Sequence, residues 1–395
     1  MDKLKIINGK ILTPNRIVSG TIYVESGKIR EVSEGNQEIS DAHTIDAKGC
    51  YVSPGFIDIH THGAGNHDFM DGTLESYLQI AETHARYGTT ALYPTTIAST
   101  TEELEQTFSV YKEAKINNKK GASFMGLHLE GPYFSMNQKG AQNPKYIRNP
   151  DKEEYLMILK NAEHIARWSS APELEGSKEF AETLGRFNIL PAIGHSDAIY
   201  EEVAEAFEWG YTHVTHLYSC TSGVMRRNMR RYAGVIEAAY LIPDMTVEII
   251  ADGVHLPASL LKLVYQIKGA EKIALITDSM RAAGTSEGLS MLGSLKNGQP
   301  VIVEDGVAKL PDRSAFAGSV ATADRLVRVM NFLGETPLLE TIQMITSTPA
   351  RIMGIEKTKG SLTKGKDADI VIFNDNIDIK VVIINGKLIL NNFKS

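Results

Sequence analysis

The stretch Pro54-Gly55-Phe56-Ile57-Asp58-Ile59-His60-Thr61-His62-Gly63 contains a short apolar run that ends in two histidines two residues apart. The run has the length and composition of a buried β-strand. Alternate side chains of a strand point the same way, so the imidazoles of His60 and His62 can converge on one metal ion. Two histidines at a strand end can equally be ordinary surface or core residues. The meaning of this pair therefore depends on the rest of the chain.

Similar apolar runs recur along the chain and alternate with amphipathic helical stretches. Eight such runs cover residues 56–60, 90–95, 123–130, 164–169, 189–195, 212–217, 246–251 and 272–278. Helical stretches cover residues 74–87, 101–115, 200–209, 257–267 and 323–332. Strands that alternate with helices indicate βα units and a parallel sheet. With eight strands, a closed (β/α)8 barrel of the TIM type is more economical than an open sheet.

Both chain ends have a different pattern, made of short β-rich runs separated by turn residues. Asn8-Gly9 and Ser26-Gly27 separate the N-terminal runs, and Asn385-Gly386 predicts a hairpin between the last two strands. We expect the two ends to pair into one small β-sandwich domain formed by residues 1–53 and 355–395. Residues 54–354 would then form the α/β barrel.

Composition excludes several classes of partner. The 395 residues include 41 Lys and Arg against 48 Asp and Glu, a net charge of -7 without a polybasic run. Neither nucleic acid nor an anionic membrane is therefore an expected partner. The sequence has no signal-peptide pattern and no apolar stretch near the roughly 20 residues of a membrane span, which predicts a soluble cytoplasmic protein. The two cysteines, Cys50 and Cys220, predict reduced thiols and no disulfide framework.

Candidate reactive side chains occur where the predicted strands end. In α/β barrels the reacting groups come from the C-terminal ends of the strands. The residues at those positions are His60, His62, Glu130, His195, His216 and Asp278.

These residue types suit metal-dependent hydrolysis. A divalent ion lowers the pKa of bound water and polarises a carbonyl group, which are two needs of amide hydrolysis near neutral pH. Glu130, His195 and His216 make a minimal three-ligand site that leaves a coordination position open, and His60 with His62 could complete a second site. Asp278 is then the expected catalytic acid and base, taking a proton from water and delivering it to the leaving nitrogen.

Each of these residues also has a simpler explanation. Glu130 could be a loop carboxylate before Gly131-Pro132, His195 could lead into a helix, His216 could be a core histidine, and Asp278 could cap a helix. All of these explanations would have to hold together at one rim of one barrel. The joint pattern therefore favours a metal site.

Several motifs resemble N-acetylglucosamine-6-phosphate deacetylases, a family of the amidohydrolase superfamily. The resemblance spans nearly the whole chain. Two of its motifs, His128-Leu129-Glu130-Gly131-Pro132 and Ala251-Asp252-Gly253-Val254-His255, are far more specific than His-x-His. The motifs are Pro54-Gly55 through Gly63 with Asp68-Phe69-Met70-Asp71-Gly72-Thr73, His128-Leu129-Glu130-Gly131-Pro132, Gly194-His195-Ser196, Thr215-His216-Leu217-Tyr218, Ala251-Asp252-Gly253-Val254-His255 and Thr277-Asp278.

The resemblance implies an activity and a set of roles. The reaction would be release of acetate from an N-acetylhexosamine 6-phosphate. Glu130, His195 and His216 would be the main metal ligands, with His60 and His62 adding a second ion as in two-metal members of the family. Asp278 would be the acid and base.

The resemblance also implies substrate contacts. In the family, a phosphate is held by an arginine and by the histidine of Asp-Gly-x-His across a homodimer interface, which here implies Arg227 (or Arg226) and His255. A guanidinium suits a phosphate dianion. Ala317-Gly318-Ser319 resembles the small-residue turn near the sugar.

The sequence departs from the family at three places. Gln142 replaces the histidine that usually follows Lys-Gly-Ala, and it can donate a neutral hydrogen bond but carries no charge. Ser219-Cys220-Thr221 replaces Asn-Ala-Met, and Ser279 replaces the alanine after Thr277-Asp278. The predicted metal ligands are complete while the residues facing the sugar differ, so the acyl group or the hexosamine can differ too.

Two alternative functions remain open from the sequence. One is an amidohydrolase for another N-acyl or cyclic amide substrate, and the other is a non-catalytic barrel that serves binding or assembly. Six potential metal or acid/base residues disfavour the second. The residues leave open whether one or two ions bind, and whether the metal is Zn, Fe, Mn or Co.

Overall fold

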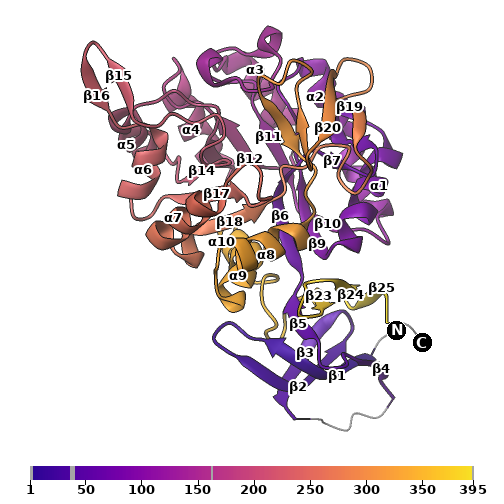
Figure 1. The fold of residues 1–395 in the computed structure, drawn as a ribbon. Helices are drawn as coiled ribbons and strands as arrows, with labels where there is room; N and C mark the ends of the chain where they lie inside the picture. Colours follow the sequence, from indigo (N-terminus) through magenta and orange to yellow (C-terminus); the bar gives the residue numbers. More distant parts are fainter. Residues whose placement is uncertain (1–2, 36–40, 162, 394–395) are drawn as a thin grey trace.

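The computed structural model describes residues 3–35, 41–161 and 163–393. Its main part is built from parallel strands, and every predicted apolar run coincides with one of them or, for residues 123–130, with two (Figure 1). These strands are β6 (Phe56–Thr61), β9 (Thr89–Pro94), β10 (Ser123–Phe124), β11 (Leu127–Glu130), β12 (Ile165–Ser170), β13 (Leu190–Ile193), β14 (His213–Val214), β17 (Thr246–Ile250) and β18 (Ile273–Ile276). All six residues of β6 are buried, as expected for a parallel strand that is covered on both faces.

The parallel strands form two sheets, which are connected by two single-residue bridges. One sheet has the order β10-β9-β6 and the other the order β11-β12-β13-β14-β17-β18. One parallel bridge joins Thr95, directly after β9, to His128 in β11, and the other joins Thr61, the last residue of β6, to Ser279 after β18. The break between β10 and β11 lies at Gly126, whose φ is +149° and where a Cβ would lie 2.6 Å from that of Ala166.

Helices follow most of the parallel strands, and all five predicted helical stretches are confirmed. Threonines begin two of them: Thr73 Oγ1 accepts from the Ser76 N–H and Thr100 Oγ1 from the Glu103 N–H. The helices are α1 (Leu74–Arg86), α2 (Thr101–Asn117), α3 (Lys152–Asn161), α4 (Ser177–Arg186), α5 (Tyr200–Glu208), α6 (Val235–Leu241), α7 (Ala258–Lys268), α8 (Ala323–Arg328), which runs into a π-helical turn (Val329–Leu333), α9 (Leu338–Ile345) and α10 (Ser347–Ile352). Within the described ranges, none of these helices has both the length and the hydropathy needed to cross a bilayer.

The two chain ends share one eight-stranded sheet, drawn in indigo and yellow below the parallel strands in Figure 1. Antiparallel pairing of β5 with β23 joins the N-terminal strands to the C-terminal ones, and β24 with β25 forms the predicted hairpin around Asn385-Gly386. The strands are β1 (Lys3–Leu12), β2 (Ile17–Glu25), β3 (Lys28–Glu34), β4 (His43–Asp46), β5 (Tyr51–Pro54), β23 (Ile370–Phe373), β24 (Ile379–Ile384) and β25 (Lys387–Asn391).

The prediction that Asn8-Gly9 ends the first strand is wrong. Strand β1 runs through both residues, and its pairing with β2 shifts register between Ile6 and Gly9. Asn8 adopts a φ of +56°, a conformation that asparagine tolerates better than most residues. The dipeptide therefore makes a bulge within the strand and not a chain reversal.

An antiparallel sheet that the sequence patterns did not predict lies between β18 and α8. Its strands are β19 (Gly288–Leu292), β20 (Gln299–Glu304), β21 (Val307–Lys309) and β22 (Phe316–Ser319). Ser319 at the end of β22 bridges Ser279, which directly follows Asp278, the predicted acid and base. This insertion therefore reaches the edge at which the predicted reactive residues lie.

Candidate metal centre

The predicted reactive residues lie at the C-terminal ends of their parallel strands. His60 is in β6 and Glu130 ends β11, while His195, His216 and Asp278 follow β13, β14 and β18. The last three have φ values of +49°, +29° and +45°, a backbone region that costs a non-glycine residue about 1–3 kcal/mol. Surrounding hydrogen bonds hold this strained backbone, such as Asp278 N–H to His60 O at 2.9 Å. Such strain concentrates at functional sites.

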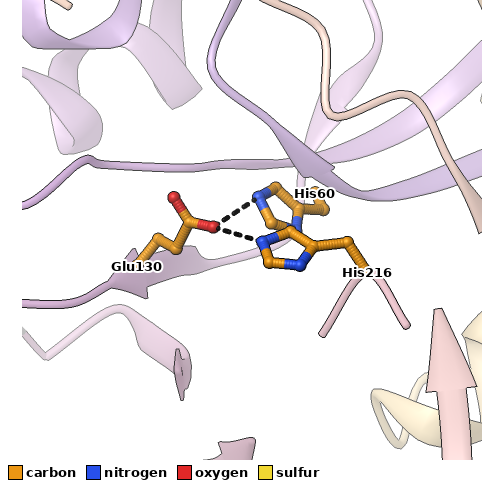
Figure 2. Close-up of side chains that lie close together, drawn as sticks. All are labelled: His60, Glu130 and His216. Atoms are coloured by element: carbon orange, nitrogen blue, oxygen red, sulfur yellow. Dashed lines mark hydrogen bonds and ion pairs between the residues drawn. The ribbon is translucent and has the colours of Figure 1, made fainter. Parts of the chain in front are cut away.

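Three imidazoles converge on one carboxylate oxygen. Glu130 Oε1 lies 3.0 Å from His216 Nε2, 3.4 Å from His60 Nε2 and 3.4 Å from His195 Nε2. Figure 2 shows His60 and His216 turned toward this oxygen. Ligands bound to zinc at about 2.0–2.1 Å in a tetrahedron lie about 3.3–3.4 Å apart, close to the three distances from Glu130 Oε1, and the donor atoms of His60, Glu130 and His216 all lie within 4.8 Å of one another. The donors therefore fit a shared divalent ion.

A second set of donors lies beside the first. His60 Nε2 and His62 Nε2 are 3.3 Å apart, and Asp278 Oδ1 lies 3.3 Å and 3.1 Å from them. From the sequence, only His60 and His62 are predicted ligands of a second ion. The geometry adds Asp278 to that pair, and it also places His60 with Glu130 and His216. His60 thus lies in both groups.

In three of the histidines, His60, His195 and His216, a hydrogen bond at Nδ1 leaves Nε2 free to bind a metal. The Nδ1–H of His195 donates to Gln138 O at 2.8 Å, and that of His216 donates to Ser219 O at 3.0 Å. The Nδ1–H of His60 donates to the Glu248 carboxylate at 3.2 Å. In the neutral ring each bond selects the tautomer whose Nε2 carries a lone pair, whereas in the protonated ring Nε2 carries a proton and donates to the carboxylates. Among the described residues, His62 Nδ1 has no hydrogen-bond partner.

The buried carboxylates of the site remain charged. Burial alone would raise the pKa of Glu130, but hydrogen bonds from His195, His216 and His60 outweigh burial and hold that pKa well below its usual range. Burial likewise lowers the pKa of His60 by itself, whereas the charge of Asp278 and the contact with Glu130 raise it to about 10. The site thus demands positive charge, which a divalent cation supplies. Mixed imidazole and carboxylate donors suit Zn, Fe, Mn and Co alike.

A cavity of about 320 Å³ opens over these residues. Its lining includes five of the predicted substrate-binding residues: Gln142, Ser219, Cys220, His255 and Gly318. The unpredicted insertion contributes Leu292 and Phe316 to the wall, and the Phe316 ring lies 4.8 Å from that of His255.

The other predicted substrate residues lie outside the cavity wall. Ala317 and Ser319 flank Gly318 on β22, where both are fully buried. Arg227 is on β15 (Met225–Arg227), which pairs with β16 (Arg230–Tyr232) in a hairpin that projects from the body of the protein (Figure 1). Its guanidinium donates to Asp197 O at 2.9 Å. Within the described parts of this single chain, Arg227 does not line the cavity.

The sequence patterns did not predict a set of buried polar residues that contact the site. Glu248 on β17 and Arg167 on β12 are fully buried and form an ion pair. Arg167 also donates to Thr215 Oγ1 at 2.8 Å, and Glu248 accepts from the backbone N–H of His216 at 3.3 Å. A charged residue inside an apolar strand run was the available signal, because such a residue is seldom buried without a partner.

Comparison with known proteins identifies the family to which this chain belongs. Residues 51–389 match the Amidohydrolase family. The chain is 32% identical over 393 residues to the N-acetylglucosamine-6-phosphate deacetylase of Bacillus subtilis (strain 168), covering 98% of this chain and 97% of that protein. It is 31% identical over 339 residues to the N-acetylgalactosamine-6-phosphate deacetylase of Escherichia coli O157:H7, covering 85% of this chain and 87% of that protein.

A solved structure agrees with the sequence comparison. The crystal structure of N-acetylglucosamine-6-phosphate deacetylase from Pasteurella multocida matches with a TM-score of 0.91 at 27% identity, over 98% of this chain and 100% of that one. The chain therefore belongs to the amidohydrolase family. The relatives named here are deacetylases of N-acetylhexosamine 6-phosphates, which agrees with the resemblance identified in the motifs.

Proposed function

We infer that this protein hydrolyses the N-acetyl group of N-acetylglucosamine 6-phosphate, giving the amino sugar phosphate and acetate. The observation that carries this proposal is the convergence of His60, His195 and His216 on Glu130 Oε1, with Asp278 beside them at the floor of the cavity. The relatives that match over nearly the whole chain support the choice of substrate.

The proposed reaction needs an ion and a base. A divalent ion held by Glu130, His195 and His216, with His60 and His62 available to a second, would lower the pKa of water and polarise the acetyl carbonyl. Burial raises the pKa of Asp278, but His60 and His62 outweigh burial and lower it, so Asp278 is an anion ready to accept a proton. Asp278 takes a proton as the water oxygen bonds to the acetyl carbon. It then gives the proton to the nitrogen as the carbon–nitrogen bond breaks.

The phosphate would be held by His255 and Arg227. His255 lines the cavity, and its Nδ1–H donates to Asp252 at 2.8 Å, which fixes the ring. Arg227 lies on the projecting β15–β16 hairpin, whose tip residue Met229 is 85% exposed. We propose that this hairpin contacts a second copy in a homodimer, so that Arg227 reaches the partner's cavity.

The identity of the hexosamine is the finer part of the proposal. Gln142, Ser219 and Cys220 line the cavity in place of the residues usual for the family, and one relative is named for the galactosamine epimer. Glucosamine is the first choice because more of the full-length relatives carry that name. Hydrolysis of another N-acyl or cyclic amide is the alternative.

We also propose that the two parallel sheets form one closed (β/α)8 barrel over residues 54–354. The bridges Thr95 to His128 and Thr61 to Ser279, which link the two sheets, support closure. Residues 1–53 and 355–395 would form the separate small β domain, which the shared eight-stranded sheet supports.

A substrate panel tests the activity. The 6-phosphates of N-acetylglucosamine and N-acetylgalactosamine and the two free sugars would be assayed for acetate release, with metal content measured on the same sample. We expect fastest release from N-acetylglucosamine 6-phosphate. Preference for a free sugar, or no release from any of the four, would reject this assignment.

A further inference from the structure

Gln142 contacts Oε2 of Glu130, the oxygen opposite the one that faces His60, His195 and His216. His62 Nε2 lies 3.6 Å from this same Oε2. Gln142 is 8% exposed, and its Nε2 donates to Glu130 Oε2 at 2.7 Å. Its Oε1 accepts from the backbone N–H of Ala98 at 2.9 Å. One amide therefore joins the loop after β9 to the end of β11.

The chemistry of the neighbours fixes which way this amide faces. A backbone N–H can only donate and an ionised carboxylate can only accept, so the amide oxygen must face Ala98 and the nitrogen must face Glu130. A charged side chain does not reproduce this pair of bonds, because a carboxylate only accepts and an ammonium or guanidinium group only donates. Both bonds are buried, so losing either leaves a polar atom without its partner.

The two oxygens of Glu130 consequently have separate tasks. Oε1 faces three imidazole nitrogens, while Oε2 receives the Gln142 amide. We propose that Gln142 is a positioning residue that restrains Glu130 to bind its ion through Oε1 alone. Without the amide, the carboxylate is free to rotate and bring Oε2 to the ion as well.

This proposal rests on the metal site of the proposed function, and the test separates the two. The metal-free protein would be titrated with Co(II) against a chromogenic chelator, and the visible absorption of the cobalt-loaded protein would be recorded. Tetrahedral cobalt absorbs more strongly than cobalt of higher coordination number, so the spectrum reports how Glu130 binds.

Three variants make the comparison. Gln142→Leu removes both hydrogen bonds, and Gln142→Asn keeps an amide that is too short to span both partners. Gln299→Leu is the matched control, because Gln299 Nε2 donates to Ala141 O at 2.8 Å and so supports the same loop without touching Glu130. Thermal melting of each metal-free variant checks that it folds.

We expect both Gln142 variants to bind Co(II) about 10 to 100-fold more weakly than the parent, the usual effect of losing a contact to a metal ligand. Their cobalt absorption should fall, while Gln299→Leu keeps parental affinity and spectrum. Parental affinity and spectrum in a folded Gln142 variant, or equal losses in Gln142→Leu and Gln299→Leu, would overturn the proposal. Failure of the parent protein to bind Co(II) would instead reject the metal site itself.

Discussion

The carboxylate of Glu248 accepts a hydrogen bond from His60 Nδ1 at 3.2 Å, and both side chains are fully buried. The same carboxylate pairs with Arg167, so an ion pair beneath the site orients a metal-binding imidazole above it. Glu248 thereby connects β17 and β12 to the ligand on β6.

Removing the charge of Glu248 should therefore damage both stability and metal binding. Glu248→Gln leaves the buried Arg167 without its counter-ion, which typically costs about 3–5 kcal/mol of unfolding free energy. The weaker acceptor for His60 should reduce metal affinity by about 10 to 100-fold. Urea denaturation of the metal-free protein and a metal titration measure the two effects.

Glu340→Gln provides a control, because Glu340 accepts from the Tyr265 hydroxyl at 2.7 Å without contacting the site residues described above. It should leave metal affinity unchanged. Parental stability in Glu248→Gln would show that the buried ion pair does not support the site.

The ligand assignment predicts that Glu130 and His195 are required for the tightly held ion. A Glu130→Ala, His195→Ala double variant should fold and lack that metal, because two of the three donors in the minimal site are gone. Elemental analysis after desalting measures the loss. His164→Ala, at the start of β12 and partly exposed, should retain metal. Full occupancy in the double variant would contradict the assignment.

Asp278 should carry the proton in the chemical step. Asp278→Asn keeps the shape of the side chain but removes the base, so kcat should fall by about 10²-fold or more. Steady-state kinetics on metal-loaded enzyme check this expectation. Near-parental kcat with metal bound would assign the proton transfer to another residue.

Arg227 should act on the phosphate group. Arg227→Ala loses a charge-assisted contact of about 1.5–3 kcal/mol, so kcat/KM for the phosphorylated sugar should fall by roughly 10 to 100-fold. Activity on the free sugar should hardly change. Arg226→Ala, on the exposed neighbouring residue, serves as the comparison and tests the other arginine that the motif allowed.

Equal losses on phosphorylated and free sugar would point to folding or assembly instead. Size-exclusion chromatography with light scattering tests the cross-subunit part, for which we expect a dimer. A fully active monomer would exclude a contribution of Arg227 from a neighbouring subunit.

Buried parallel strands could be predicted from the sequence because they are largely apolar runs that end in polar residues, as Ile273–Ile276 followed by Thr277 and Asp278 illustrates. The β19–β22 insertion was not predicted, because β19 and β20 are only partly buried and lack the continuous burial of the parallel strands. Their pairing depends on contacts with the rest of the fold more than on local pattern.

The candidate site was likewise only partly predictable from the sequence. His60, Glu130 and His216 lie at or just after strand ends that the pattern locates, so their convergence could be expected. The link from Glu248 to Arg167 and His60 joins three strands that are distant in sequence, and no local pattern encodes it. Gln142 was recognised as a departure from the family, but its bond to Glu130 required coordinates.

We propose that this protein needs a divalent ion held around Glu130 to deacetylate N-acetylglucosamine 6-phosphate. The most direct test measures acetate release from that substrate by one preparation as purified, after chelator removes its metal, and after a divalent ion is returned. We expect activity in the protein as purified, loss of activity after chelation, and recovery in proportion to the metal regained. Undiminished acetate release from protein shown to be metal-free would contradict this proposal.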